Sequence, residues 1–151
     1  GAAVALDTTD GSIMGYTTLP QHRVHKKTEL DIAGFCDWVI DLDETPELVA
    51  VEMPLSFARS SQAMRSMALC YGQLHGVCVG LQWPHRGIFV REWQKKMLGK
   101  FPKGTSKEAA FKAAQKLEPD ELWLKSEYAK TPHDGIIDAY LIARYVWSEN
   151  N

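Results

Sequence analysis

The chain has 151 residues, of which 45% are hydrophobic and 24% are charged, and its formal net charge is −2. These values fit one globular domain, residues 1–151, with a single substantial core, and they leave little room for a second domain. A run of about 18 apolar residues that would span a membrane is lacking, as is the basic start and long apolar stretch of a secretion signal. We therefore expect a cytoplasmic protein without a membrane partner.

Charge is distributed unevenly along the chain. Between Glu29 and Glu52 there are eight acidic residues and no basic residue. Between Arg86 and Lys116 there are nine basic residues against two acidic ones. A polyanion could therefore bind the second segment although the molecule as a whole is slightly acidic.

The first elements in chain order are a predicted hairpin and a helix. Val4 to Asp7 and Ile13 to Thr18 are apolar runs that flank the turn-forming sequence Thr9-Asp10-Gly11-Ser12. From Leu30 to Leu42 apolar residues recur at helical spacing, and Thr28 is the expected N-cap.

The middle of the chain predicts a strand, a long helix and two more strands. Leu48 to Met53 is a compact apolar strand that Pro54 ends. Ser56 to His75 has a helical pattern that Gly76 is expected to stop. Val77 to Gln82 and Gly87 to Val90 follow as short apolar strands.

Two helices complete the predicted order. One runs from Thr105 to Leu117, with Thr105 and Glu108 at capping-box spacing, and the other runs from Asp134 to Trp147. Alternation of strands and helices implies a mixed α/β structure around a partly parallel sheet.

Acidic residues stand where a catalytic or metal site would need them. Asp7 ends the first strand, and Glu52 ends a strand that is otherwise Leu-Val-Ala-Val. A carboxylate in a buried strand is costly unless it is paired or bound to a metal. The alternative is that both acids lie in solvent beyond the strand ends.

Asp134 and Asp138 lie four residues apart in an otherwise apolar helix, so both carboxylates share a face. Stabilisation of a helix N-terminus would explain Asp134 alone, but it does not explain Asp138 one turn further on. A hard divalent cation between the two would remove their repulsion, and four carboxylates suit two-metal phosphoryl transfer. We therefore expect Mg²⁺ as the cofactor, with Mn²⁺ also able to support activity.

Short segments in order between Val4 and Val146 carry a resemblance to a known family. They are Leu6-Asp7, Val51-Glu52, Gly72 to Val77 (GQLHGV), Gly104 to Ala109 (GTSKEA) and Asp138 to Ala143 (DAYLIA). In these segments the chain resembles the RuvC family of Holliday junction resolvases, and most of all its short bacteriophage members.

The resemblance implies an RNase H-like fold, with a mixed five-stranded sheet flanked by helices. It assigns metal coordination and catalysis to Asp7, Glu52, Asp134 and Asp138, and it implies a homodimer that cuts four-way DNA junctions. Here Gly135 occupies the slot three residues before Asp138 that the family often uses for a ligand. His133 is the alternative to Asp134 as the fourth ligand, and aspartate is favoured because it is the harder ligand.

The basic stretch supplies the predicted DNA contacts. Lysine and arginine side chains neutralise phosphates, and the candidates are Arg91, Lys95, Lys96, Lys100, Lys103 and Lys107. Lys107 also resembles the lysine at a helix start in the family, which implies a place near the scissile phosphate and a catalytic role. Phe57 follows the Glu52 strand, where the family carries a DNA-contacting aromatic, although a core or dimer position is an equal alternative.

Dimerisation is expected through the Ser56 to His75 helix, and the alternative is that this helix is simply central to the core of the monomer. Its apolar stripe exceeds the needs of one sheet face and consists of Met64, Met67, Ala68, Tyr71 and Leu74. The sequence therefore predicts a magnesium-dependent endonuclease on branched DNA, with no nucleotide cofactor. The alternatives are an RNase H-like nuclease that acts on RNA/DNA hybrids or general branched phage DNA, and a junction-binding protein without catalysis.

Overall fold

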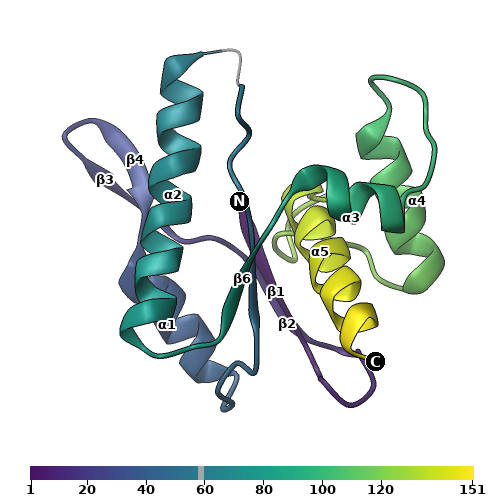
Figure 1. The fold of residues 1–151 in the computed structure, drawn as a ribbon, viewed down its shortest axis with the longest axis horizontal. Helices are drawn as coiled ribbons and strands as arrows, with labels where there is room; N and C mark the ends of the chain where they lie inside the picture. The colour runs from purple at the N-terminus through teal and green to yellow at the C-terminus, as the bar shows by residue number, and fades with distance from the viewer. Residues whose placement is uncertain (58–59) are drawn as a thin grey trace. The chain divides into compact units, whose positions relative to one another are not determined.

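The computed structural model describes residues 1–57 and 60–151 (Figure 1). Within these ranges the chain forms five helices and six strands. They divide into two compact units, of which unit 1 comprises residues 1–18 and 91–151 and unit 2 comprises residues 19–90. Each unit is described by itself.

Unit 1 begins with an antiparallel hairpin. β1 (Ala2–Leu6) pairs with β2 (Ile13–Thr18), and the register shifts between Ala5 and Leu6. Three helices complete the unit: α3 (Val90–Met97, in this unit from Arg91 on), α4 (Ser106–Leu117) and α5 (Asp134–Asn150).

Helix α5 is central to unit 1. It packs along β1, β2 and α4, and Figure 1 shows it in yellow beside the hairpin. A helix that packs on several sides must be apolar on several sides. Seven of its side chains are buried accordingly: Ile136, Ile137, Tyr140, Leu141, Ile142, Tyr145 and Val146.

Unit 2 contains a hairpin and a parallel strand pair. β3 (Gln21–Val24) pairs antiparallel with β4 (Lys27–Leu30), and β5 (Val49–Glu52) pairs parallel with β6 (His85–Ile88). A parallel pair needs a crossover connection, which α2 (Ser61–Gly80) provides. Helix α1 (Ile32–Asp41) packs against α2.

The predicted mixed α/β class is confirmed, but residues 1–57 and 60–151 form no five-stranded sheet. Within the described ranges there are three two-stranded sheets, β1–β2, β3–β4 and β5–β6. One expected strand is missing because Val77 to Gly80 continue α2 instead of forming a strand over Val77 to Gln82.

The expected stop of the long helix at Gly76 is therefore wrong. A Cβ added at Gly76 would meet nothing within 4 Å, so this glycine lies on an open helix face. The Leu81 N–H donates to the Val77 carbonyl at 2.9 Å, which keeps the helical bonding pattern to the end of α2. Glycine within a helix costs only about 1 kcal/mol relative to alanine, so the rest of α2 can offset it.

One predicted cap is wrong, and a second residue is at the cap position but forms no capping box. Thr28 lies in β4, and α1 is capped by Asp31, whose Oδ1 accepts from the Gly34 N–H at 3.1 Å. Thr105 stands at the N-cap of α4, but its hydroxyl donates to the Pro102 carbonyl at 2.8 Å. The capping box with Glu108 is therefore absent.

None of the helices over residues 1–57 and 60–151 is both long and apolar enough to cross a membrane.

Candidate functional site

Asp7 directly follows β1 and organises the turn of the hairpin. Its Oδ1 accepts hydrogen bonds from the Thr9 hydroxyl and from the Thr9 N–H, the latter at 2.7 Å. Its backbone N–H donates to the Ser12 carbonyl, and its own carbonyl accepts from the Gly11 N–H, both at 2.9 Å. The Thr9 hydroxyl bond, followed by the Thr9 N–H bond, lowers the pKa of Asp7 and keeps its carboxylate charged at neutral pH.

Asp134 and Asp138 occupy the first two turns of α5. Asp134 is the first residue of the helix, and its side chain is half exposed, whereas Asp138 is partly buried one turn further on. Because α5 packs along β1, the strand that leads to Asp7 and the helix that carries the other two acids are neighbours within unit 1.

Lys107 of α4 contacts Asp134 of α5. Its Nζ lies 2.5 Å from Asp134 Oδ2, which joins two predicted site residues that are 27 positions apart. The hydrogen bond with Asp134 and the Asp134 charge raise the pKa of Lys107, and Asp138 and Glu108 add to this. Lys107 therefore stays an ammonium ion beside Asp134 at neutral pH. An ion pair this exposed contributes little to stability.

His133 caps α5. Its Nδ1 accepts from the Ile136 N–H at 3.3 Å, so the proton of the neutral ring must lie on Nε2. Nδ1 is then used by the cap and Nε2 carries the proton, so neither offers a lone pair to a cation while the cap persists. The geometry favours Asp134 over His133 as a ligand.

Glu52 is the last residue of β5 in unit 2, and it is exposed. Of the two alternatives for Glu52, exposure to solvent is the one that the structure shows, so burial does not require a metal or ion partner for this carboxylate. The reason is local: β5 is a short strand of four residues, and of these only Val51 is buried.

The carboxylates are suitable donors for a hard divalent cation, because Mg²⁺ and Mn²⁺ prefer oxygen ligands. Over residues 1–57 and 60–151, no group of three or more His, Cys, Asp or Glu side chains is arranged to hold a metal ion. The described geometry brings together Asp134 and Lys107, with Asp138 one turn away, whereas the turn that follows Asp7 lies beside the later turns of α5, where Trp147 contacts Thr8.

Glu121 and Trp123 tie the segment before α5 to the hairpin, and the sequence patterns gave no sign of either. Glu121 Oε1 accepts from the Tyr16 hydroxyl at 2.7 Å and from the Trp123 N–H at 3.3 Å. Trp123 is fully buried between Tyr16 and Tyr140, with ring centroids 6.3 and 4.7 Å away, and it adopts a φ of 56°. Its carbonyl accepts from the His133 N–H at 2.8 Å. Glu121 and Trp123 thus help to position the start of α5.

The Tyr16–Glu121 contact predicts a loss of stability at high pH. Burial, followed by the Glu121 hydrogen bond, raises the pKa of Tyr16 from 10.0 to about 12. A raised pKa in the folded state stabilises the protein fully below pH 10, and this stabilisation is lost as the pH rises from 10 through 12.

We expect Tyr16→Phe to be less stable than wild type at pH 9 and to lose less stability between pH 9 and 12. Urea unfolding at each pH measures this, and Tyr128→Phe, at an exposed tyrosine, is the control. An equal decline in Tyr16→Phe and wild type would contradict the prediction.

The predicted phosphate-contacting residues of unit 1 are all exposed. Arg91, Lys95 and Lys96 lie on α3, Lys107 lies on α4, and Lys100 and Lys103 lie in the connection between these helices. Exposure makes each of them accessible to a phosphate backbone.

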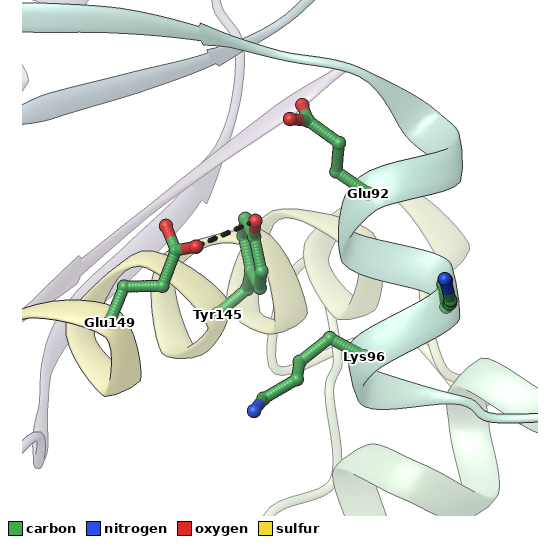
Figure 2. A pocket seen from close by; sticks show the side chains of 5 residues that line it. Glu92, Lys96, Tyr145 and Glu149 are labelled. Atoms are coloured by element: carbon green, nitrogen blue, oxygen red, sulfur yellow. Dashed lines mark hydrogen bonds between the residues drawn. The ribbon is translucent and has the colours of Figure 1, made fainter.

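Lys95 and Lys96 differ from the other cations in their surroundings. They line a cavity of about 390 Å³ together with Glu92 of α3 and with Tyr145 and Glu149 of α5 (Figure 2). The Tyr145 hydroxyl donates to Glu149 Oε1 at 2.9 Å. Two carboxylates beside two ammonium groups weaken the local positive potential, so Lys100 and Lys103 are the better placed phosphate ligands.

The aromatic residues near the basic segment and after β5 fall into two groups. Trp93 is buried in the core, whereas Phe89 is exposed. Phe57 is 89% exposed, which rules out the alternative of a core position for it within this chain.

No protein-family model matches this chain, and no curated protein sequence matches it at a significant level.

Proposed function

We propose that this protein is a nuclease of the class that hydrolyses phosphodiesters with carboxylate-bound divalent cations. Within that class, we propose a RuvC-like endonuclease that cuts branched DNA such as four-way junctions. The single observation that carries the proposal is the contact of Lys107 with Asp134, on a helix that bears Asp138 one turn later and packs along the β1 strand before Asp7. Carboxylate oxygens that can bind a divalent cation, with an ammonium group beside them, are parts that such chemistry uses.

The proposed ligands of the cation in unit 1 are Asp7, Asp134 and Asp138, and the resemblance adds Glu52. When bound, Mg²⁺ or Mn²⁺ supplies neutralisation of the phosphate charge and activation of water. The ammonium group of Lys107 offers a fixed positive charge beside the scissile phosphate, and the exposed cations of unit 1 hold the flanking backbone. Water oxygen adds to phosphorus as the bond to the 3′ oxygen breaks, which leaves a 5′ phosphate and a 3′ hydroxyl.

The finer parts of the proposal rest on the resemblance described above. They are an RNase H-like arrangement of the whole chain and a two-fold homodimer that presents one site to each of two opposed strands. A four-way junction has two-fold symmetry, which a symmetric dimer would match.

The decisive experiment is incubation of the protein with an end-labelled mobile four-way junction, with and without Mg²⁺ or Mn²⁺. Paired, symmetric incisions that require the ion would support the proposal. Faster cleavage of a sequence-matched RNA/DNA hybrid or flap would assign a different nuclease substrate. Tight junction binding without cleavage under any of these ions would favour a non-catalytic junction-binding protein.

The two groups of lysines should differ in their effect on DNA binding. Removal of one phosphate-binding side chain lowers the slope of log affinity against log salt by about one unit. We expect Lys100→Ala with Lys103→Ala to lower the slope by about two units, on every branched substrate alike. Lys95→Ala with Lys96→Ala should lower it less, because Glu92 and Glu149 share their cavity. Fluorescence anisotropy over a salt series measures both, and an unchanged slope in the first pair would assign those lysines to a free surface.

A further inference from the structure

The position of the Asp7 carboxylate depends on the turn that follows it. Its Oδ1 is bonded to the Thr9 N–H and hydroxyl, and its backbone is bonded to Gly11 and Ser12. Thr8, Thr9 and Asp10 are exposed, so few packed side chains hold this part of the turn. Whatever fixes the turn therefore also fixes the direction of the carboxylate.

Two residues in the C-terminal half of α5 donate hydrogen bonds to the turn. The Arg144 Nη1 donates to the Gly11 carbonyl at 3.0 Å, and the Trp147 Nε1 donates to the Thr8 carbonyl at 3.1 Å. Arg144 and Trp147 are three residues apart on one helix face, and the guanidinium carbon lies 4.7 Å from the Trp147 ring centroid. Figure 1 shows the hairpin turn beside the C-terminal end of α5.

The turn is shaped to accept this pair. Gly11 is buried and has a φ of 75°, a backbone conformation that glycine adopts without strain. A Cβ at this position would lie 2.5 Å from Arg144 Nη1 and 3.0 Å from Trp147 Cε2. Gly11 thus allows both donors to approach the turn backbone.

We infer that Arg144 and Trp147 are positioning residues for Asp7, and this inference rests on the proposed function. Helix α5 carries Asp134 and Asp138 in its first two turns and the Arg144–Trp147 pair in its later turns. One rigid helix therefore holds two of the acids directly and the third through the turn. The two hydrogen bonds fix the turn that orients the Asp7 carboxylate, which is the role of a contact behind a metal ligand.

The test uses variants that remove one donor and change little else. Trp147→Phe keeps an aromatic ring beneath Arg144 but loses the N–H that binds Thr8, and Arg144→Lys keeps the charge but loses the guanidinium fork. Gly11→Ala disturbs the same contact from the side of the turn. Tyr145→Phe is the matched control, because it removes a hydroxyl that donates to Glu149 from the same helix.

The first measurement is hydrogen exchange of the Asp7 and Gly11 amides, both of which are bonded inside the turn. Loss of one hydrogen bond should speed their exchange about tenfold in the three test variants, with no change at the amides of the middle of α5. The control should exchange like wild type. Unchanged exchange at both turn amides in Trp147→Phe and Arg144→Lys would overturn the inference.

The second measurement is calorimetric titration of each protein with Mn²⁺ alone, without DNA. Removal of an outer contact that orients a ligand weakens metal binding by about 10- to 100-fold, and we expect such a loss in the test variants only. Faster turn exchange with unchanged Mn²⁺ affinity would overturn the positioning role. A wild-type protein that binds no Mn²⁺ would instead overturn the proposed function, so the two failures are distinguishable.

Discussion

Asp138→Asn is expected to reduce cleavage of a four-way junction by about a thousandfold or more while the protein stays folded and still binds the junction. An ion ligand stabilises transition-state charge by several kcal/mol, and each 1.36 kcal/mol is worth about tenfold in rate. The substitution keeps the size of the side chain and removes its charge. Asp7→Asn and Glu52→Gln should have the same effect, whereas binding should persist because it depends on the basic residues.

Single-turnover cleavage and anisotropy on the same junction separate these two effects. Asp10→Asn is a matched control, because Asp10 lies in the same turn as Asp7 and its Oδ1 only accepts from the Ser12 N–H at 2.8 Å, which an asparagine can also do. Near-normal turnover by any one of the three variants would remove that residue from the site. The His133 side chain caps α5. If His133→Ala reduces the cleavage rate more than Asp134→Asn does, the choice of Asp134 as the ligand is wrong.

Trp123→Ala is expected to lower the free energy of unfolding by about 3–5 kcal/mol, the usual cost of truncating a buried tryptophan. Its side chain has 0% exposure and packs against Tyr140 and Tyr16. Trp123→Gly should cost less than Trp123→Ala, by about 1 kcal/mol, which reverses the usual order. The reason is the φ of 56° at this position, which strains alanine but not glycine.

Urea unfolding followed by far-ultraviolet circular dichroism measures both variants. Leu122→Ala is the control, because this neighbouring side chain is exposed and its loss should change stability by less than about 0.5 kcal/mol. A glycine variant as unstable as the alanine variant, or less stable, would show that the strain at this position does not matter.

Patterns with a local cause were readable from the sequence. The β1–β2 hairpin follows from two apolar runs around Asp10-Gly11, and α5 follows from a long apolar periodicity. The second hairpin, β3–β4, was missed because its two-residue turn is His25-Lys26, with φ values of 46° and 67°. Such turns normally carry Asn or Gly, so the usual signal was absent.

The run Val77 to Gly80 shows where local pattern fails. Four small and apolar residues after a glycine fit a strand as well as a helix end, because short apolar runs do not distinguish the two. The backbone hydrogen bonds of α2 and the burial of Cys78 show that this run belongs to the helix. This one segment removed a strand from the predicted sheet.

The sequence by itself determined the order of the acids and the grouping of the basic residues, because residue type and spacing along one element are local properties. It also determined the two-acid face of α5, since four residues make about one helical turn. Only the tertiary structure decided that Lys107 contacts Asp134, that Glu121 and Trp123 hold the approach to α5, and that Arg144 and Trp147 bind the Asp7 turn. These contacts join residues between 27 and 139 positions apart, or depend on a backbone angle at Trp123, and no pattern along the chain encodes such pairings.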